Sequence, residues 1–170
     1  YCIIEYGGGY ASTYGGALWL EGPSISVDHC TISNSAVYGV VCDDDSEFTS
    51  FTNNTLMDND SYDIYIEGNA AHTIGSGNVI DGSGILVDGD TYTQSEATWS
   101  LQTAPFTIDG TFYVQSDGGA TLNIAAGNTI QFTEGSQMEI GSDGYGTLKA
   151  IGTESLPILF TSTSTQKQGE

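Results

Sequence analysis

Short alternations of apolar and polar residues run along the whole chain, and each one ends at Gly, Asn, Asp or Ser. A two-residue period bounded by turn-forming residues predicts β-strands. Strong helix formers nowhere combine at a period of 3.6 residues, so the pattern predicts an all-β protein. In the second half, strands are expected around 112–114, 122–124 and 130–132, and again around 138–140, 148–150 and 158–160.

The alternations repeat at a nearly constant spacing. When residues 30–43 are laid over 54–67, Ile32 meets Leu56 and Val40 meets Ile64, each 24 residues apart. Other apolar pairs lie 22 to 28 residues apart: Cys42 and Ile66, Leu18 and Val40, Leu20 and Cys42, Val114 and Ile140, Ile124 and Ala150, and Phe132 and Phe160.

A repeat of this length with several strands in it predicts a parallel β-helix, in which each repeat forms one coil of roughly 22–28 residues. Alternate residues then point inward and stack on their counterparts in the next coil, about 4.8 Å away. An antiparallel β-sandwich is the structural alternative, although it does not explain an offset kept by apolar and polar positions alike.

Five segments resemble parts of known β-helices. Residues 27–32 (VDHCTI) and 51–56 (FTNNTL) resemble Asn- and Cys-punctuated rungs, whereas 119–132, 146–153 and 157–162 resemble a segment common in large secreted bacterial β-helix proteins. The chain therefore resembles the right-handed parallel β-helix (pectin-lyase-like) superfamily over nearly its whole length. The resemblance implies a right-handed solenoid with turn asparagines stacked in a ladder, for which the candidates are Asn34, Asn53 and Asn54.

In such proteins the 119–132 type of segment opens a repeat and the Cys/Asn-rich rungs close it. Here that order is reversed. The resemblance therefore implies closing coils over 1–87, a seam over 88–105 and the opening coils of the next repeat over 106–170. Because the chain starts directly on an apolar strand-like run at Tyr1, we expect it to be a fragment or a processed piece of a longer array.

The charge is strongly one-sided, with 22 acidic residues, two lysines, no arginine and a net charge of -20. Phosphate contacts need Lys and Arg, so nucleic acid is not expected as a partner, and anionic polysaccharides and membranes are disfavoured. No apolar run approaches the roughly 20 residues that a membrane span needs. This composition is typical of secreted or surface proteins, so an extracellular location is expected.

Acidic turns make calcium the candidate cofactor, because hard cations prefer oxygen ligands. Asp58, Asp60 and Asp63 fall within six residues, and a second group consists of Asp43, Asp44 and Asp45. Neither group has EF-hand spacing. Solvated acidic turns without a bound ion are the alternative interpretation.

Catalysis is not expected. Enzymes resembling pectate lyase use an Arg base, and those resembling polygalacturonase use Gly-His-Gly and Arg-x-Lys motifs, none of which occurs in this chain. The two histidines, His29 and His72, have no nucleophile or metal-ligand spacing. No acid–base pair can therefore be assembled from the sequence.

Three cysteines, Cys2, Cys30 and Cys42, leave at least one thiol unpaired within the chain. The absence of a CxxC motif argues against a zinc ribbon, and buried apolar cysteines are the preferred interpretation. Whether Cys2 and Cys30 form a disulfide stays open at this point.

Aromatic residues gather near the Gly-rich segment of the first coil. Such side chains form sugar-stacking surfaces or contacts with another chain, and packing within the molecule is the alternative. These candidate contact residues are Tyr6, Tyr10, Tyr14 and Trp19.

The function predicted from these features is a non-catalytic module of an extracellular fibre, stalk or surface adhesin, stacked end to end on neighbouring copies or repeats of the same β-helix. The alternative is a carbohydrate-binding or polysaccharide-degrading β-helix with glycan partners. The alternative needs basic residues in a cleft, whereas Lys149 and Lys167 are the only lysines of this chain and it has no arginine. The first function is therefore preferred.

Overall fold

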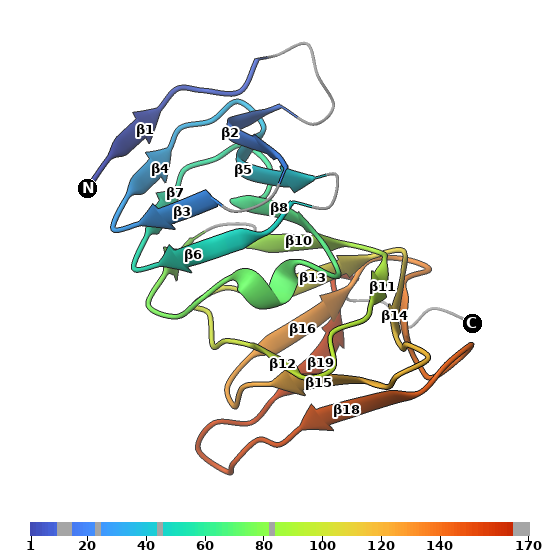
Figure 1. Cartoon of the computed structure of the whole chain (residues 1–170). Coiled ribbons are helices and arrows are strands. Elements are labelled where there is room, and N and C mark those ends of the chain that lie inside the picture. The colour runs from blue at the N-terminus through green and yellow to red at the C-terminus, as the bar shows by residue number, and fades with distance from the viewer. Residues whose placement is uncertain (10–14, 23–24, 44–45, 82–83, 165–170) are drawn as a thin grey trace.

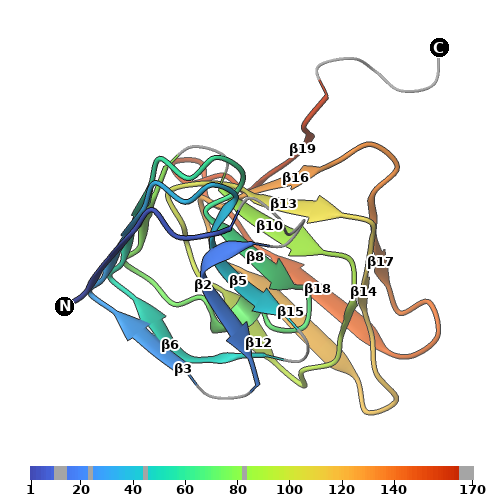
Figure 2. The same cartoon turned by 90° about the horizontal axis from the view of Figure 1, so that it is seen from above.

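The chain winds into a parallel β-solenoid, with its first and last coils at opposite ends (Figure 1). The computed structural model describes residues 1–9, 15–22, 25–43, 46–81 and 84–164. Seen along the axis, the coils superpose around a common interior (Figure 2). Neighbouring strands within the described sheets all pair in parallel, so the predicted all-β solenoid is confirmed.

Sheet B is the wall that runs through every coil. It has seven strands, and their register places inward-facing apolar residues of neighbouring strands opposite one another. In spatial order it comprises β2 (Gly16–Glu21), β5 (Tyr38–Asp43), β8 (Ile64–Glu67), β10 (Ile85–Asp88), β13 (Phe106–Asp109), β16 (Thr129–Phe132) and β19 (Leu159–Ser162).

Two other sheets line the N-terminal coils only. Their strands are two to five residues long, and turn-forming residues separate them from the strands of sheet B. Sheet A comprises β1 (Ile3–Glu5), β4 (Thr31–Ser33), β7 (Thr55–Met57) and β9 (Val79–Ile80), and sheet C comprises β3 (Ile25–Asp28) and β6 (Phe48–Thr52).

The C-terminal coils replace these walls with two new sheets. Sheet D comprises β11 (Thr91–Tyr92), β14 (Thr111–Val114) and β17 (Gln137–Ile140), and sheet E comprises β12 (Ala97–Trp99), β15 (Ala120–Ile124) and β18 (Gly146–Ala150). A 3-10 helix, η1 (Ala71–Thr73), contacts both β6 and β12. Sheet C, η1 and sheet E therefore form one side of the solenoid, interrupted by a helical turn (Figure 1).

This exchange of walls falls in the predicted seam. Sheets D and E begin with β11 and β12, which both lie within 88–105, whereas sheet B continues through that segment without a break. The division of the chain into closing coils, seam and opening coils of a repeat stays a prediction, because it concerns an array beyond these coils.

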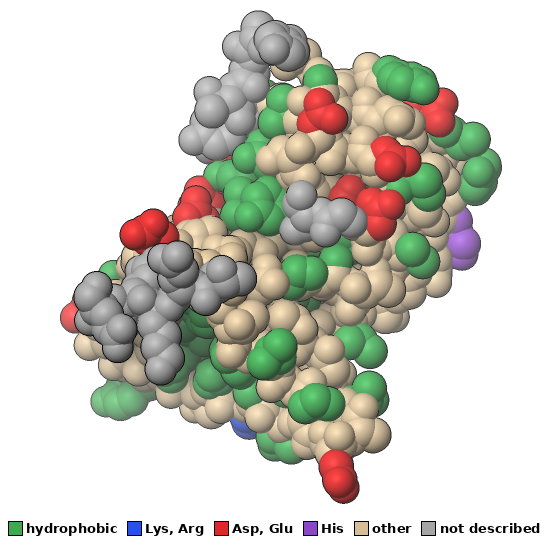
Figure 3. Space-filling view, turned by 180° about the vertical axis from the view of Figure 1, so that it is seen from behind, with side chains coloured by type: hydrophobic (Ala, Val, Ile, Leu, Met, Phe, Trp, Pro, Cys, Tyr) green, Lys and Arg blue, Asp and Glu red, His purple; other side chains and the backbone are tan. Residues whose placement is uncertain are grey.

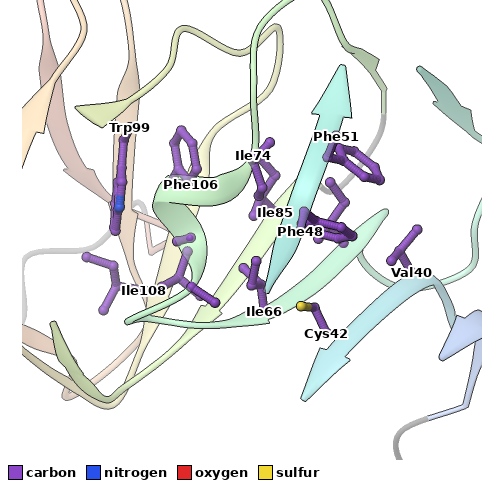
Figure 4. Close-up of a cluster of buried hydrophobic side chains, with 14 of the residues drawn as sticks. Val40, Cys42, Phe48, Phe51, Ile66, Ile74, Ile85, Trp99, Phe106 and Ile108 are labelled. Carbon is purple, nitrogen blue, oxygen red and sulfur yellow. The ribbon is translucent and has the colours of Figure 1, made fainter. Parts of the chain in front are cut away.

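The core is a column of stacked apolar side chains inside sheet B. One row consists of Leu18, Val40, Ile64, Ile85, Phe106, Ile130 and Phe160 in register. Trp99 stacks on Phe106 with ring centroids 4.8 Å apart, which joins the sheet E wall to this column (Figure 4). Burying one such large apolar side chain contributes about 1.5–3 kcal/mol, so the column is the main source of stability.

The predicted registers are confirmed in the N-terminal coils, where Ile32 aligns with Leu56 and Val40 with Ile64. The predicted pairs Cys42–Ile66, Leu18–Val40, Leu20–Cys42, Val114–Ile140 and Ile124–Ala150 are confirmed as well.

The predicted pairing of Phe132 with Phe160 is wrong, because Phe160 aligns with Ile130 and Phe132 with Ser162. The connection from β18 to β19 has eight residues, against four between β15 and β16. The longer connection moves the register by two residues relative to the prediction and keeps the same side chains inward.

Buried side-chain amides form a ladder along one turn of the solenoid. Asn54 accepts a hydrogen bond from the Cys30 amide and its own amide donates to Asn78, while Asn128 accepts from the Gln102 amide. Of the predicted asparagines, Asn54 belongs to this ladder. Asn53 precedes it and Asn34 follows β4, and these two residues occupy left-handed turn positions with φ 54° and 56°. Their side-chain amides donate to the hydroxyl of the preceding residue.

Candidate functional site

The N-terminal end of the solenoid leaves apolar side chains uncovered. Strands β1, β2 and β3 each lie at the edge of their sheet, so one side of each backbone has no neighbouring strand in the described part of the chain. A cavity of about 350 Å³ opens at this end, lined by Cys2, Ile4, Leu18, Leu20 and Val27 among others. These side chains continue the interior column, so the core is open to solvent at this face.

The C-terminal end has the same character. Strands β17, β18 and β19 are the last in their sheets. Apolar side chains are exposed there, with Ile151 77% exposed, Leu159 53% and Phe160 42%. Phe160 belongs to the inward row of sheet B, so another coil of β-helix on this face would extend the core.

The outer face of sheet B is packed by its own side chains. Val41 is fully buried, and the ring of Tyr65 lies 5.4 Å from that of Tyr38. The Tyr65 hydroxyl donates a 2.6 Å hydrogen bond to Asp88 Oδ2. The Tyr62 hydroxyl bonds with Thr107, and burial raises the pKa of Tyr62. These rings therefore cover the sheet instead of presenting open aromatic faces.

An acidic row follows this packed strip at the C-terminal ends of the sheet B strands. Glu21 aligns with Asp43, Glu67 with Asp88, and Asp88 with Asp109. Glu67 also continues the row after Asp43, because it follows Ile66, which aligns with Cys42. Sequence reasoning missed this row, although its members lie at the same offsets as the apolar pairs. Figure 3 shows acidic side chains at several separate places on the rear surface, between larger tan and green areas, and a trace of blue low on this face.

The predicted acidic groups do not come together. Asp58, Asp60 and Asp63 lie in the connection that enters β8, whereas Asp43 ends β5 at the opposite end of the sheet B strands. The two groups therefore do not occupy equivalent positions of neighbouring coils, because Asp58 follows Met57, which aligns with Ser33. Asp44 and Asp45 lie outside the described residues, within which no three His, Cys, Asp or Glu side chains are close enough to hold a metal ion.

Asp63 is the buried member of this group, at 2% exposure. Its Oδ1 accepts a 2.6 Å hydrogen bond from Asn59 Nδ2, and its Oδ2 has no hydrogen-bond partner among the described residues. Burial raises the pKa of Asp63 from 3.8 to about 6; the Asn59 hydrogen bond opposes the rise, and the charges of Asp81 and Asp58 add to it. The carboxyl is thus held where its charge is poorly compensated.

Two of the four predicted contact aromatics are described. Tyr6 follows β1 with φ 57° and is 79% exposed, and Trp19 lies on the outer face of β2 at 43% exposure. Tyr10 and Tyr14 lie outside the described residues. Both described rings belong to the first coil, next to the open N-terminal face.

The remaining polar candidates have structural contacts. His72 lies in η1 with its Nδ1 2.8 Å from the Asn69 carbonyl and its ring edge toward Tyr92. His29 is an exposed turn residue with φ 56°. Lys149 Nζ lies 2.9 Å from Glu96 Oε1, on the outer side of sheet E.

Comparison with known proteins identifies one family. The model of that family, described as a right handed beta helix region, matches residues 2–100. No curated protein and no solved structure matches the chain. None of the helical segments among the described residues is long and apolar enough to cross a membrane.

Proposed function

Since the chain belongs to the right-handed β-helix family, we propose that it is a non-catalytic structural module of an extracellular fibre, stalk or surface adhesin. In this role its two end faces stack on neighbouring β-helical coils. The observation that carries the proposal is that the described strands at both faces lie at the edges of their sheets, while core-column side chains are exposed at the C-terminal face and line an open cavity at the N-terminal face.

The physical argument concerns the cost of leaving these faces in water. An open strand edge presents unpaired N–H and C=O groups and is a template for another strand. Repeat proteins need their terminal coils covered, because each coil buries its apolar face only against a neighbour. A further coil on either face would pair these groups, and one on the N-terminal face would also fill the 350 Å³ cavity there.

The proposed surroundings follow from charge. A net charge of -20 favours solubility of a long solenoid and resists lateral aggregation, because the sides of neighbouring molecules repel each other. The end faces, which carry apolar side chains, are then the preferred surfaces for association.

The test is light scattering with negative-stain electron microscopy over a range of protein concentrations. We expect rods that lengthen with concentration. Phe160→Lys, which places a charge on the C-terminal face, should stop growth, and Leu101→Lys should not. Leu101 has nearly the same exposure as Phe160, 44% against 42%, but lies in the connection between β12 and β13 and not on a terminal strand.

A mixing experiment determines the direction of stacking. Leu18→Lys alters the N-terminal face, where Leu18 lines the cavity. Each variant alone should stay monomeric, and an equimolar mixture with Phe160→Lys should form dimers, because one intact face of each kind remains. A wild-type protein that stays monomeric at all concentrations would refute stacking between molecules.

Carbohydrate binding is the second candidate, and the exposed Trp19 on the outer face of sheet B favours it. An indole face stacks on sugar rings, and the adjacent acidic row offers acceptors for hydroxyl groups of a neutral glycan. Binding on a glycan array that is lost in Trp19→Ala but kept in Tyr145→Ala, a matched exposed aromatic, would support this candidate over the first.

A further inference from the structure

Two cysteines stand at equivalent positions in the first two coils. Ile3 in β1 aligns with Thr31 in β4, so Cys2 and Cys30, which precede them, are also neighbours. The Thr31 amide donates a 2.8 Å hydrogen bond to the Cys2 carbonyl, which holds the two backbones together at this point. Both residues carry free thiols.

Their side chains share one space. Cys2 and Cys30 have the same parity as Ile4 and Ile32, which point into the solenoid, and both line the cavity at the N-terminal face. Aligned residues of neighbouring parallel strands lie about 4.8 Å apart, within the Cα separation of roughly 4.4–6.8 Å found in disulfides. Each thiol now donates only to a nearby backbone carbonyl, of Ile3 or Asp28.

The third cysteine does not compete for either partner. Cys42 lies in sheet B, is fully buried, and its thiol donates to the Ser46 carbonyl at 3.1 Å. Burial raises the pKa of Cys42 to about 12, and the charges of Glu67 and Glu47 add to the rise. Since the thiolate is the reactive form, this thiol is inert near neutral pH.

We propose that Cys2 and Cys30 form a reversible disulfide that staples the first coil when the protein meets a small disulfide oxidant such as glutathione disulfide. The two thiols lose two protons and two electrons and join through one new S–S bond. The S–S bond of the oxidant breaks and takes up these protons and electrons, which gives two molecules of thiol.

The staple acts on the weakest attachment of the coil. Strand β1 has three residues, pairs with β4 alone, and leaves Ile3 55% exposed. A disulfide closes the loop between residues 2 and 30, so β1 can no longer separate from β4 by fraying. Oxidation thereby fixes the shape of the N-terminal face, and reduction releases it.

The test exposes micromolar reduced protein to glutathione disulfide, then alkylates it with N-ethylmaleimide in denaturant for intact-mass analysis and peptide mapping. We expect one maleimide adduct, on Cys42, and no bound glutathione. Amide exchange at the junction of β1 with β4, measured at the Tyr6 N–H that donates to the Ser33 carbonyl, should slow by about tenfold or more in the oxidised protein and recover with a phosphine reductant.

Variants separate the staple from general oxidation. Cys42→Ala should close the same disulfide and leave no thiol to alkylate, whereas in Cys2→Ser the oxidant should not change the exchange of the Tyr6 N–H. Glutathione retained on Cys2 beside an alkylated Cys30, or disulfide-linked dimers, would overturn the proposal. So would a closed disulfide that leaves the exchange of the Tyr6 N–H unchanged.

Discussion

Replacing Asp63 by Asn should stabilise the protein at neutral pH. The Asp63 side chain is buried, one of its oxygens has no hydrogen-bond partner in the part of the chain that the structure describes, and its pKa is raised from 3.8 to about 6, with burial as the largest cause. An amide has nearly the same shape, carries no charge, and still accepts the hydrogen bond from Asn59. The substitution removes the uncompensated charge without opening a cavity.

The direction of the change in stability follows from the pKa of Asp63 in the folded and in the unfolded chain. The folded-state pKa lies above the unfolded value, so the ionised carboxylate favours the unfolded chain. The penalty is complete above about pH 6 and fades as the pH falls toward 3.8. A shift of about two units corresponds to roughly 3 kcal/mol, and the cost of burying an amide reduces the expected gain to about 1–3 kcal/mol.

Urea unfolding at pH 7.5 and pH 3.5 measures this gain. The control is Asp60→Asn, which removes one charge from the same connection at an exposed position. Asp63→Asn should exceed the control in unfolding free energy at pH 7.5, and the two should converge at pH 3.5. An Asp63→Asn protein no more stable than the control at pH 7.5 would refute the reasoning, as would an equal advantage at both pH values.

Three further predictions concern the ladder, the ion pair and calcium. Asn78→Ala should lower the unfolding free energy by about 2–4 kcal/mol in urea, since it leaves buried partners unpaired, and exposed Asn53→Ala should cost less than half as much. Lys149→Met should leave the unfolding free energy nearly unchanged, because both partners of the Lys149–Glu96 pair are exposed; a clear loss of stability would contradict this. If the acidic turns bind calcium, 1 mM calcium should raise the Tm by several degrees in wild type but not in Asp60→Asn, and an unchanged wild-type Tm would exclude it.

The coil architecture could be predicted because it depends on local alternation and on like residues recurring at one offset. Ile32 and Leu56 reveal their register in the sequence, since each must face inward at the same point of its coil. The register of Phe160 could not be predicted in this way. The connection before β19 is longer than its counterpart in the preceding coil, and residues in a connection show no apolar–polar alternation that would reveal the extra length. Turn length changes register without changing alternation.

The candidate site was harder to predict for a related reason. The donating side of the ladder continues at Gln102, whose side-chain Nε2 donates to the Gly75 carbonyl while its Oε1 has no hydrogen-bond partner among the described residues, so a search for asparagines misses it. The raised pKa of Asp63 depends on its burial in the folded protein, which the neighbouring acidic residues in the sequence do not reveal. Adjacency in sequence grouped Asp63 with exposed Asp58 and Asp60, although their surroundings differ.

The exchange of walls has a mechanical consequence. Strand-pairing hydrogen bonds in a solenoid point along its long axis, so tension applied between the two ends loads them directly and in series. Between the coil of β8, η1 and β9 and the coil of β10, β11 and β12, the pairing of β8 with β10 is the only strand pairing in the described part of the chain. A tether built from this chain would yield first at that level, and the coils on either side would stay folded.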